Sequence, residues 1–195
     1  MNAKEYWNDR YRNGGDSGDG SYGKLAAFKA EIINKFIKDH KIDSIIDYGC
    51  GDGNQIKLID CKKYVGLDIS EVIIGFNLYE FKNDKSKQFI VHNPEDEIKG
   101  NADLVICLDV LYHILDESEF IKSLKDIFQC SSKYVILYTN ILNSDIKTAS
   151  HIKYRNIFKY LYKVPNFKII EIIKQKYPEE SYSNFIILKK VKNEN

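Results

Sequence analysis

The sequence predicts an α/β fold in which helices cover both faces of a mostly parallel sheet, with an antiparallel hairpin at the carboxyl end. Two observations predict it. Short apolar stretches alternate with helical periodicities between residues 43 and 139. Two β-rich stretches, 167–174 and 182–190, are joined by a short polar turn. Alternating strands and helices are typical of parallel sheets, and closely joined strands form hairpins.

The amino-terminal part is predicted to be helical on both sides of a glycine-rich loop. A short helix is expected over 3–12 and an amphipathic helix over 24–39, because apolar residues recur there at helical spacing. Residues 13–23 between them are rich in glycine, which favours a loop.

The remaining elements follow in alternation. Strands are expected near 43–48, 63–67, 87–91, 103–108 and 132–139, and helices near 53–60, 70–80, 116–129 and 150–163. We expect one domain over 1–195, in which 1–40 hold the amino-terminal helices and a glycine-rich lid and 41–191 form the core.

Composition limits the function classes. The chain has 29 basic and 28 acidic residues and a formal charge of +1. This balance gives no electrostatic basis for nucleic-acid binding, which needs clustered phosphate contacts. No stretch approaches the roughly 20 apolar residues that span a bilayer, and the first residues lack the apolar stretch of a signal peptide. We expect a cytoplasmic protein with no membrane insertion and no nucleic-acid partner.

A metal site is not expected. The cysteines are spaced too irregularly for zinc and include no CxxC; they are Cys50, Cys61, Cys107 and Cys130. Asp109, Asp116 and Asn140 are the one set of oxygen ligands worth considering, and nothing in their spacing indicates that they converge.

The most informative stretch is IIDYGCGDG, residues 45–53. It predicts a buried strand that ends near Asp47 and turns through three alternating glycines. A second short strand ends at Asp68, 21 residues after Asp47. Glycine lets the backbone approach a ligand, and an acid at the end of the second strand binds the two hydroxyls of a ribose. A nucleoside cofactor is therefore expected. A dinucleotide is disfavoured, because its fingerprint needs a glycine where this chain has Asn54.

These motifs resemble those of the class I S-adenosylmethionine-dependent methyltransferases. IIDYGCGDGN is similar to their first motif, YVGLDIS to their second-strand motif and ADLVICLDVLYHI to their fourth-strand motif. The resemblance covers residues 40–190. It implies a Rossmann-like three-layer sandwich with a seven-stranded sheet whose last strand is antiparallel. It also implies S-adenosylmethionine as cofactor and S-adenosylhomocysteine as product.

The resemblance implies roles for named residues. Gly49 and Gly51, with Cys50 between them, would underlie the methionine moiety, and Asp47 would help to hold its ammonium group. Asp68 would bind the ribose diol. Three further residues would line the cofactor: Ile69 against the adenine, Asn93 at the adenine edge, where relatives often carry an acid, and Leu108 at the methionine through its backbone.

The amino-terminal residues, YWNDRYR followed by GGDSGDGSYG, are similar to those of small methyltransferases associated with bacterial surface-polysaccharide biosynthesis. An aromatic helix before a glycine-rich loop is suited to a lid. Trp7 and Tyr11 would cover the sulfonium by cation–π contact, and Tyr22, at the end of the loop, would face the acceptor. Alternatively, Trp7 anchors the first helix to the core.

Histidine is the expected base for a hydroxyl acceptor. His113, beside Tyr112, follows the fourth strand at the sheet edge where ligands bind, although a packing role is an equal alternative. His151 and Arg155 lie four apart on a predicted helix and therefore on one face. They would favour an anionic acceptor such as a phosphate or carboxylate; a solvated helix face is the alternative.

We therefore predict methyl transfer to a small polar acceptor, with O-methylation of a surface-glycan precursor or its phosphorylated substituent favoured. The alternatives are a catalytically inert partner protein with the same fold and another nucleoside-cofactor enzyme such as an aminopropyltransferase. An inert partner protein is expected to have an eroded glycine turn or to have lost the ribose acid, and neither change is seen in this sequence. Additional acids that aminopropyl transfer needs are not evident.

Overall fold

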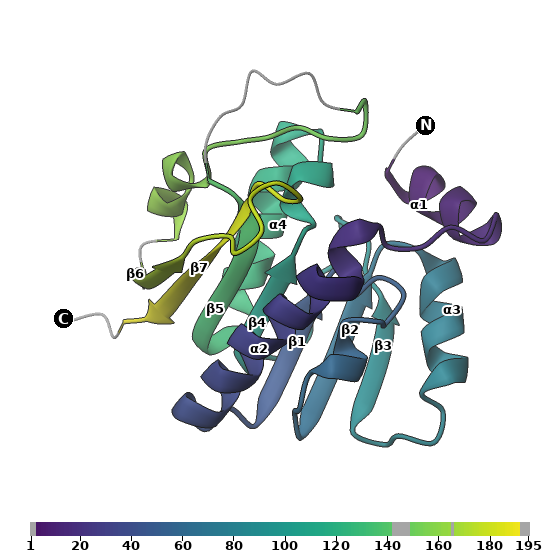
Figure 1. Ribbon diagram of the computed structural model, residues 1–195, viewed down its shortest axis with the longest axis horizontal. Helices are drawn as coiled ribbons and strands as arrows, with labels where there is room; N and C mark the ends of the chain where they lie inside the picture. The colour runs from purple at the N-terminus through teal and green to yellow at the C-terminus, as the bar shows by residue number, and fades with distance from the viewer. Residues whose placement is uncertain (1–2, 142–148, 165, 192–195) are drawn as a thin grey trace. The chain divides into compact units, whose positions relative to one another are not determined.

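The computed structural model describes residues 3–141, 149–164 and 166–191. They form two compact units, Met1–Asp96 and Glu97–Asn195, each of which is described by itself (Figure 1). The prediction of one domain with a boundary at residue 40 stays a prediction.

The first unit contains a parallel sheet in the order β3-β2-β1. Its elements, in chain order, are α1 Ala3–Arg12, η1 Asp19–Ser21, α2 Gly23–His40, β1 Ser44–Tyr48, η2 Ile56–Leu58, β2 Lys63–Asp68, α3 Glu71–Glu80 and β3 Lys87–Val91. The predicted helices near 3–12, 24–39 and 70–80 and the three predicted strands are confirmed within a residue or two.

The register of β1 and β2 brings the two acids of the nucleoside motif to one edge. Tyr48 pairs with Leu67 and Asp47 with Gly66, so the residues that follow both strands emerge side by side. The amide nitrogens of Gly49 and Cys50 both bond to the carbonyl oxygen of Leu67, at 2.8 and 2.9 Å. These bonds fold the glycine turn back over the end of β2.

The predicted helix over 53–60 is wrong. The chain runs there through turns, followed by the single 3₁₀ turn η2. Gly49, Gly51 and Gly53 have φ values of 83°, 55° and 74°, in the left-handed region that an α-helix cannot use. The carboxylate of Asp52 also accepts a bond from the Asn54 amide at 3.0 Å, which favours a local turn over a helix.

The second unit contains four strands in the order β4-β5-β7-β6. Its elements are β4 Ala102–Leu108, η3 Leu111–His113, α4 Glu117–Gln129, β5 Ser131–Asn140, η4 Ile157–Lys159, η5 Leu161–Lys163, β6 Phe167–Ile173 and β7 Ser183–Lys190. β4 and β5 are parallel, and β7 is antiparallel to both β5 and β6. The predicted hairpin is thus confirmed.

The predicted helix over 150–163 is wrong as well. The described residues there form turns and the two short 3₁₀ elements η4 and η5. Asn156 has an extended ψ of 98°, and its side chain accepts a bond from the Phe158 amide, so a helix cannot pass through it.

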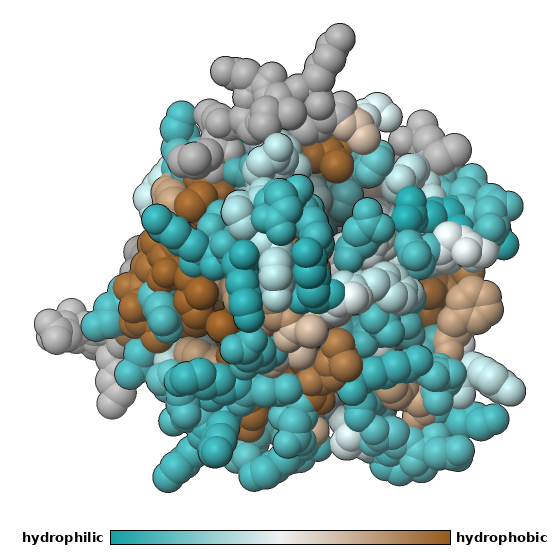
Figure 2. All heavy atoms as spheres, in the orientation of Figure 1, coloured by the Kyte–Doolittle hydropathy of each residue, from teal (hydrophilic) through white to brown (hydrophobic). Residues whose placement is uncertain are grey.

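Burial differs sharply between neighbouring strands of the second unit. Central residues of β4 and β5, such as Val105 and Ile136, are fully buried. Three isoleucines of the edge strand β6 are exposed, namely Ile169, Ile170 and Ile172. Figure 2 shows hydrophobic side chains gathered where Figure 1 places β6. None of the helices in the described ranges is long and apolar enough to cross a membrane.

Candidate cofactor and acceptor site

Asp68 fixes the glycine turn. Its carboxylate accepts a bond from the Gly51 amide at 3.0 Å and another from the Ser70 amide at 2.9 Å. Burial raises the pKa of Asp68 to about 6, although these amide bonds oppose the shift. A carboxylate can accept about four bonds, so this one has capacity left for a diol. Ile69, expected against the adenine, is half-buried beside it.

Asp47 is buried at the end of β1 and is 2% exposed. One carboxylate oxygen accepts a bond from the Tyr64 hydroxyl at 2.8 Å, and the other has no hydrogen-bond partner in the part of the chain that the structure describes. Burial raises the pKa of Asp47 to about 7. A buried carboxylate oxygen without a donor is costly unless something else supplies one. An ammonium group would supply it, so this residue fits the amino-acid end of the cofactor.

Helix α3 supports the glycine turn from the protein side. The buried side-chain amide of Asn77 donates a bond to the Gly51 carbonyl at 2.7 Å. A Cβ added to Gly53 would lie 2.6 Å from the Asn77 side-chain oxygen and 2.9 Å from the ring of Phe81. Gly53 is therefore required for packing against α3. Sequence reasoning missed Asn77, which gives no motif signal of its own.

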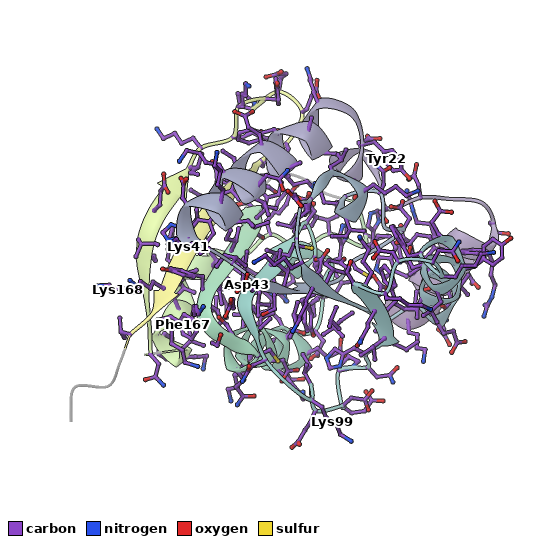
Figure 3. All side chains as sticks on the ribbon, turned by 90° about the horizontal axis from the view of Figure 1, so that it is seen from below. Tyr22, Lys41, Asp43, Lys99, Phe167 and Lys168 are labelled. Atoms are coloured by element: carbon purple, nitrogen blue, oxygen red, sulfur yellow. The ribbon has the colours of Figure 1, made fainter. Side chains whose placement is uncertain are left out.

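The amino-terminal segment is bonded to the same turn. Asp52 and Ser17 exchange two bonds: the Ser17 amide donates to the Asp52 carboxylate at 2.9 Å, and the Asp52 amide donates to the Ser17 hydroxyl at 2.8 Å. The Tyr22 hydroxyl donates to the same carboxylate at 2.8 Å. Tyr22, near the amino end of α2 (Figure 3), thus contacts the turn.

Helix α1 packs against α3, and its Tyr11 lies near the acid of β2. Trp7 and Tyr11 are stacked with their ring centroids 5.8 Å apart. The buried Asn8 between them accepts bonds from the Ser70 hydroxyl at 2.7 Å and the Val72 amide at 3.4 Å. This connects α1 to the start of α3, two residues beyond Asp68, and sequence reasoning did not find it.

Asn93 lies just after β3 and is also contacted by α1. Lys4 donates to its side-chain oxygen at 3.0 Å, while its own amides donate to Asp96 at 2.9 and 3.0 Å. Cys50 is buried within the glycine turn, and burial raises the pKa of its thiol. The structure thus brings Asp47, Cys50, the turn glycines and Asp68 together, while Trp7 and Asn93 are connected to this region through α1.

The second unit brings the two candidate bases together. The rings of His113 and His151 are stacked 5.4 Å apart, and Nδ1 of His113 lies 3.1 Å from the His151 carbonyl oxygen. A carbonyl can only accept, so in the neutral ring this nitrogen carries the proton and Nε2 has the lone pair of a base. Tyr112 lies against His113 with ring centroids 4.6 Å apart.

The residues after β4 are held in a strained conformation. Leu108 is buried at the end of the strand, and Asp109 follows with φ 61°, which is unusual for a residue other than glycine. The Asp109 carboxylate accepts bonds from the hydroxyls of Tyr112 and Ser183, each at 2.9 Å. Such strain is often found at functional sites, and no sequence signal predicted it.

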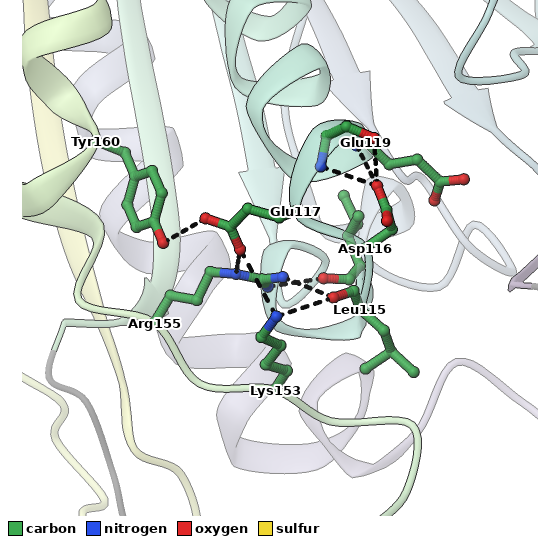
Figure 4. A network of polar contacts seen from close by, with 9 residues as sticks. Leu115, Asp116, Glu117, Glu119, Lys153, Arg155 and Tyr160 are labelled. Atoms are coloured by element: carbon green, nitrogen blue, oxygen red, sulfur yellow. Dashed lines mark hydrogen bonds and ion pairs between the residues drawn. The ribbon is translucent and has the colours of Figure 1, made fainter.

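Arg155 does not lie on a helix face beside His151. Its guanidinium is buried and donates to the carbonyl oxygens of Ile114 and Leu115, at 2.7 and 2.9 Å, and to Glu117 at 3.0 Å (Figure 4). Tyr160 donates to the other oxygen of Glu117 at 2.7 Å. The side chain therefore joins the segment after residue 150 to the start of α4, which favours a structural role over acceptor binding.

Comparison with known proteins agrees with this geometry. The family model described as "Methyltransferase domain" matches residues 22–177. No curated protein sequence matches the chain. Among solved structures, the chain is similar to magnesium protoporphyrin IX methyltransferase from Synechocystis PCC 6803 with bound S-adenosylhomocysteine. The TM-score is 0.69 at 20% identity, over 96% of this chain and 97% of that one.

Two further structures cover both units of the chain. N-methyltransferase NodS from Bradyrhizobium japonicum WM9, in complex with S-adenosylhomocysteine, has a TM-score of 0.77 at 10% identity over 98% of this chain and 100% of that one. An S-adenosylmethionine-dependent methyltransferase from Clostridium acetobutylicum ATCC 824 has a TM-score of 0.66 at 14% identity, over 96% and 98%. The predicted fold class, a seven-stranded and mostly parallel sheet with antiparallel last strands, is confirmed. The chain belongs to the methyltransferase-domain family and has the Rossmann-like fold of the S-adenosylmethionine-dependent methyltransferases.

Proposed function

We propose that this methyltransferase uses S-adenosylmethionine to methylate a hydroxyl group of a small polar acceptor in the cytoplasm. The observation that carries the cofactor assignment is the pair of acids at the ends of β1 and β2. Asp47 presents a buried carboxylate oxygen without a donor, and Asp68 is tied to the glycine turn with capacity left to accept. These features fit the ammonium group and the ribose diol of this cofactor.

When bound, S-adenosylmethionine supplies an activated methyl group on a sulfonium. The residues of the chain would hold it and the acceptor in line, which is the main requirement of such a displacement. Trp7 and Tyr11 would cover the cofactor from α1, Ile69 and Asn93 would contact the adenine, and Leu108 the methionine.

His113 is the proposed base. A hydroxyl acceptor that receives the methyl group would have to lose its proton. Nε2 of His113 would take that proton, with Nδ1 held on the His151 carbonyl. His151 and Tyr112 lie against this ring and would contact the acceptor, as would Tyr22.

For the acceptor, we propose a surface-glycan precursor, because residues 6–12 and 14–23 resemble the matching part of methyltransferases associated with that biosynthesis. A phosphorylated substituent is less favoured than the sequence predicted, because Arg155 is committed to Glu117 and two carbonyl oxygens.

The cofactor assignment is tested by calorimetry with S-adenosylmethionine and S-adenosylhomocysteine. We expect both to bind with a stoichiometry of one. The acceptor proposal is tested by incubating the enzyme and S-adenosylmethionine with neutral and phosphorylated sugar acceptors. Failure of both ligands to bind would refute the cofactor assignment. Methylation of phosphorylated acceptors alone would refute the preference for neutral ones.

A further inference from the structure

The face of Gly51 is covered by two hydroxyl groups of the amino-terminal segment. A Cβ added to Gly51 would lie 2.3 Å from the Ser17 Oγ and 3.6 Å from the Tyr11 hydroxyl oxygen. The two hydroxyls are themselves 3.0 Å apart and hydrogen-bonded. Glycine at 51 is thus needed to admit Ser17, and the Tyr11–Ser17 hydroxyl pair lies directly on the turn.

The hydrogen bonds of this pair leave one proton over. The Ser17 Oγ accepts a bond from the Asp52 amide at 2.8 Å, so its own proton is not used there. The bond between the two hydroxyls uses one of their two protons, whichever group donates. If Ser17 donates to Tyr11, the remaining proton is that of Tyr11, which is only 5% exposed and has no acceptor within the described ranges. If Tyr11 donates, the remaining proton belongs to the half-buried Ser17. A nearly buried donor is expected to have a partner.

Asp52 holds the pair in this position. Its carboxylate accepts the Ser17 amide at 2.9 Å and the Tyr22 hydroxyl at 2.8 Å on one oxygen, and the Asn54 amide at 3.0 Å on the other. Three donors therefore face the charge of Asp52, and its amide orients the Ser17 oxygen. Asp52 acts on any ligand through Ser17, as a positioning residue.

We propose that the Tyr11–Ser17 hydroxyl pair, positioned by Asp52, donates a hydrogen bond to the carboxylate of the cofactor's amino-acid end. The inference rests on the proposed function, in which the glycine turn underlies the methionine moiety. Asp47 would then bind the ammonium group and the hydroxyl pair the carboxylate, so that the two charges of the amino acid are recognised separately.

The test compares two ligands that differ only in that carboxylate, S-adenosylmethionine and decarboxylated S-adenosylmethionine. Their dissociation constants are measured by calorimetry for the wild type, Ser17→Ala and Tyr11→Phe. We expect each variant to lose about ten- to hundredfold in affinity for S-adenosylmethionine, as for a hydrogen bond to a charged group. Affinity for the decarboxylated ligand should stay within about twofold of the wild type.

Equal losses for both ligands, or no loss for either, would overturn the proposal. A wild type that binds neither ligand would instead overturn the proposed function, so the two failures are distinguishable. Ser17→Ala alters a half-buried side chain and carries the test by itself if Tyr11→Phe does not fold.

The positioning role of Asp52 is tested in the same way. Asp52→Asn should weaken S-adenosylmethionine selectively, and Tyr22→Phe, which removes one bond to Asp52 without touching the pair, should weaken it less. Asp43→Asn is the matched control, since Asp43 is an exposed acid of the same unit that binds Lys62. Asp52→Asn with unchanged discrimination between the two ligands would show that Asp52 does not position the pair.

Discussion

At the scale of single residues, the two acids of the nucleoside motif differ in what already holds them. Asp68 is bonded to two backbone amides, whereas one oxygen of Asp47 is buried without a donor. Asp68 therefore shapes the turn, whatever it contributes to a ligand, and we expect Asp47 to act mainly on a ligand. Their substitutions should differ accordingly.

Asp68→Ala is expected to lower the affinity for S-adenosylmethionine by about a hundredfold. The variant loses the acceptor for the ribose diol and the bond that fixes the Gly51 amide, and bonds to charged groups are worth about 1.5–3 kcal/mol each. Calorimetry measures the change. Binding of Asp68→Ala at wild-type affinity would remove the ribose assignment, and Asp43→Ala should bind like the wild type.

Cofactor affinity should fall as the pH is lowered. The pKa of Asp47 is raised to about 7 and that of Asp68 to about 6, and each must be ionised to bind an ammonium group or to accept from a diol strongly. We expect affinity to drop about tenfold or more between pH 8 and pH 5.5, measured by calorimetry. Asp47→Asn should bind S-adenosylmethionine more weakly at pH 8, and its affinity should no longer change with pH near pH 7. A flat wild-type profile would contradict this.

The same shifts predict the pH dependence of stability without ligand. Both pKa values lie above those of an unfolded aspartate, so the folded state binds more protons between about pH 4 and pH 7. The free energy of unfolding should therefore fall as the pH rises through that window. Asp47→Asn should show a weaker fall in chemical denaturation, because an amide does not titrate.

At the scale of elements, the short η3 turn and the segment near residue 151 bring the candidate bases together. His113→Ala is expected to lower kcat by about 10²–10⁴-fold, the usual contribution of a general base, with cofactor affinity unchanged. His151→Ala should have a smaller effect, since its backbone carbonyl still orients His113. Full turnover in both variants would leave no role for a histidine base.

The contact between the segment around Arg155 and α4 should matter for stability. Arg155→Ala would remove the donor to the Ile114 carbonyl oxygen and one of the donors to Leu115 and Glu117, which keep their bonds to Lys153 and Tyr160. We expect the free energy of unfolding to fall by about 1–3 kcal/mol. Arg155→Lys keeps the charge but not the fork of donors, so it should recover only part of the loss. Chemical denaturation measures both. An Arg155→Ala variant of unchanged stability but weaker acceptor binding would restore the role predicted from the sequence.

At the scale of the whole molecule, ligand binding should stabilise the folded chain. S-adenosylmethionine at 100 times its dissociation constant should add about 2.7 kcal/mol to the free energy of unfolding. For a chain of this size, that raises the melting temperature by roughly 5–10 °C. Thermal unfolding with and without ligand measures it, and Asp68→Ala at the same ligand concentration should show a smaller rise.

Most secondary structure could be predicted, because strands and long helices have periodicities that local sequence carries. The two wrong helices lie where a few side chains overrule periodicity. Residues 53–60 belong to a turn with three left-handed glycines. Within residues 150–163, the extended backbone of Asn156 and the bonds of Arg155 to carbonyl oxygens replace helical structure. Over 150–163 apolar residues recur at helical spacing, yet the packing that buries them does not require a helix.

The sequence by itself determined the fold class and singled out Asp47 and Asp68 as the expected cofactor acids, because the glycine turn and Asp68 depend on local chemistry at the ends of adjacent strands. The tertiary structure alone decided which distant side chains reach that turn and the start of α3. Ser17 and Asp52 are 35 residues apart and Asn8 and Ser70 are 62 apart, yet each pair is hydrogen-bonded. Contacts of this kind depend on how helices dock on the sheet, and neither spacing nor periodicity encodes that docking.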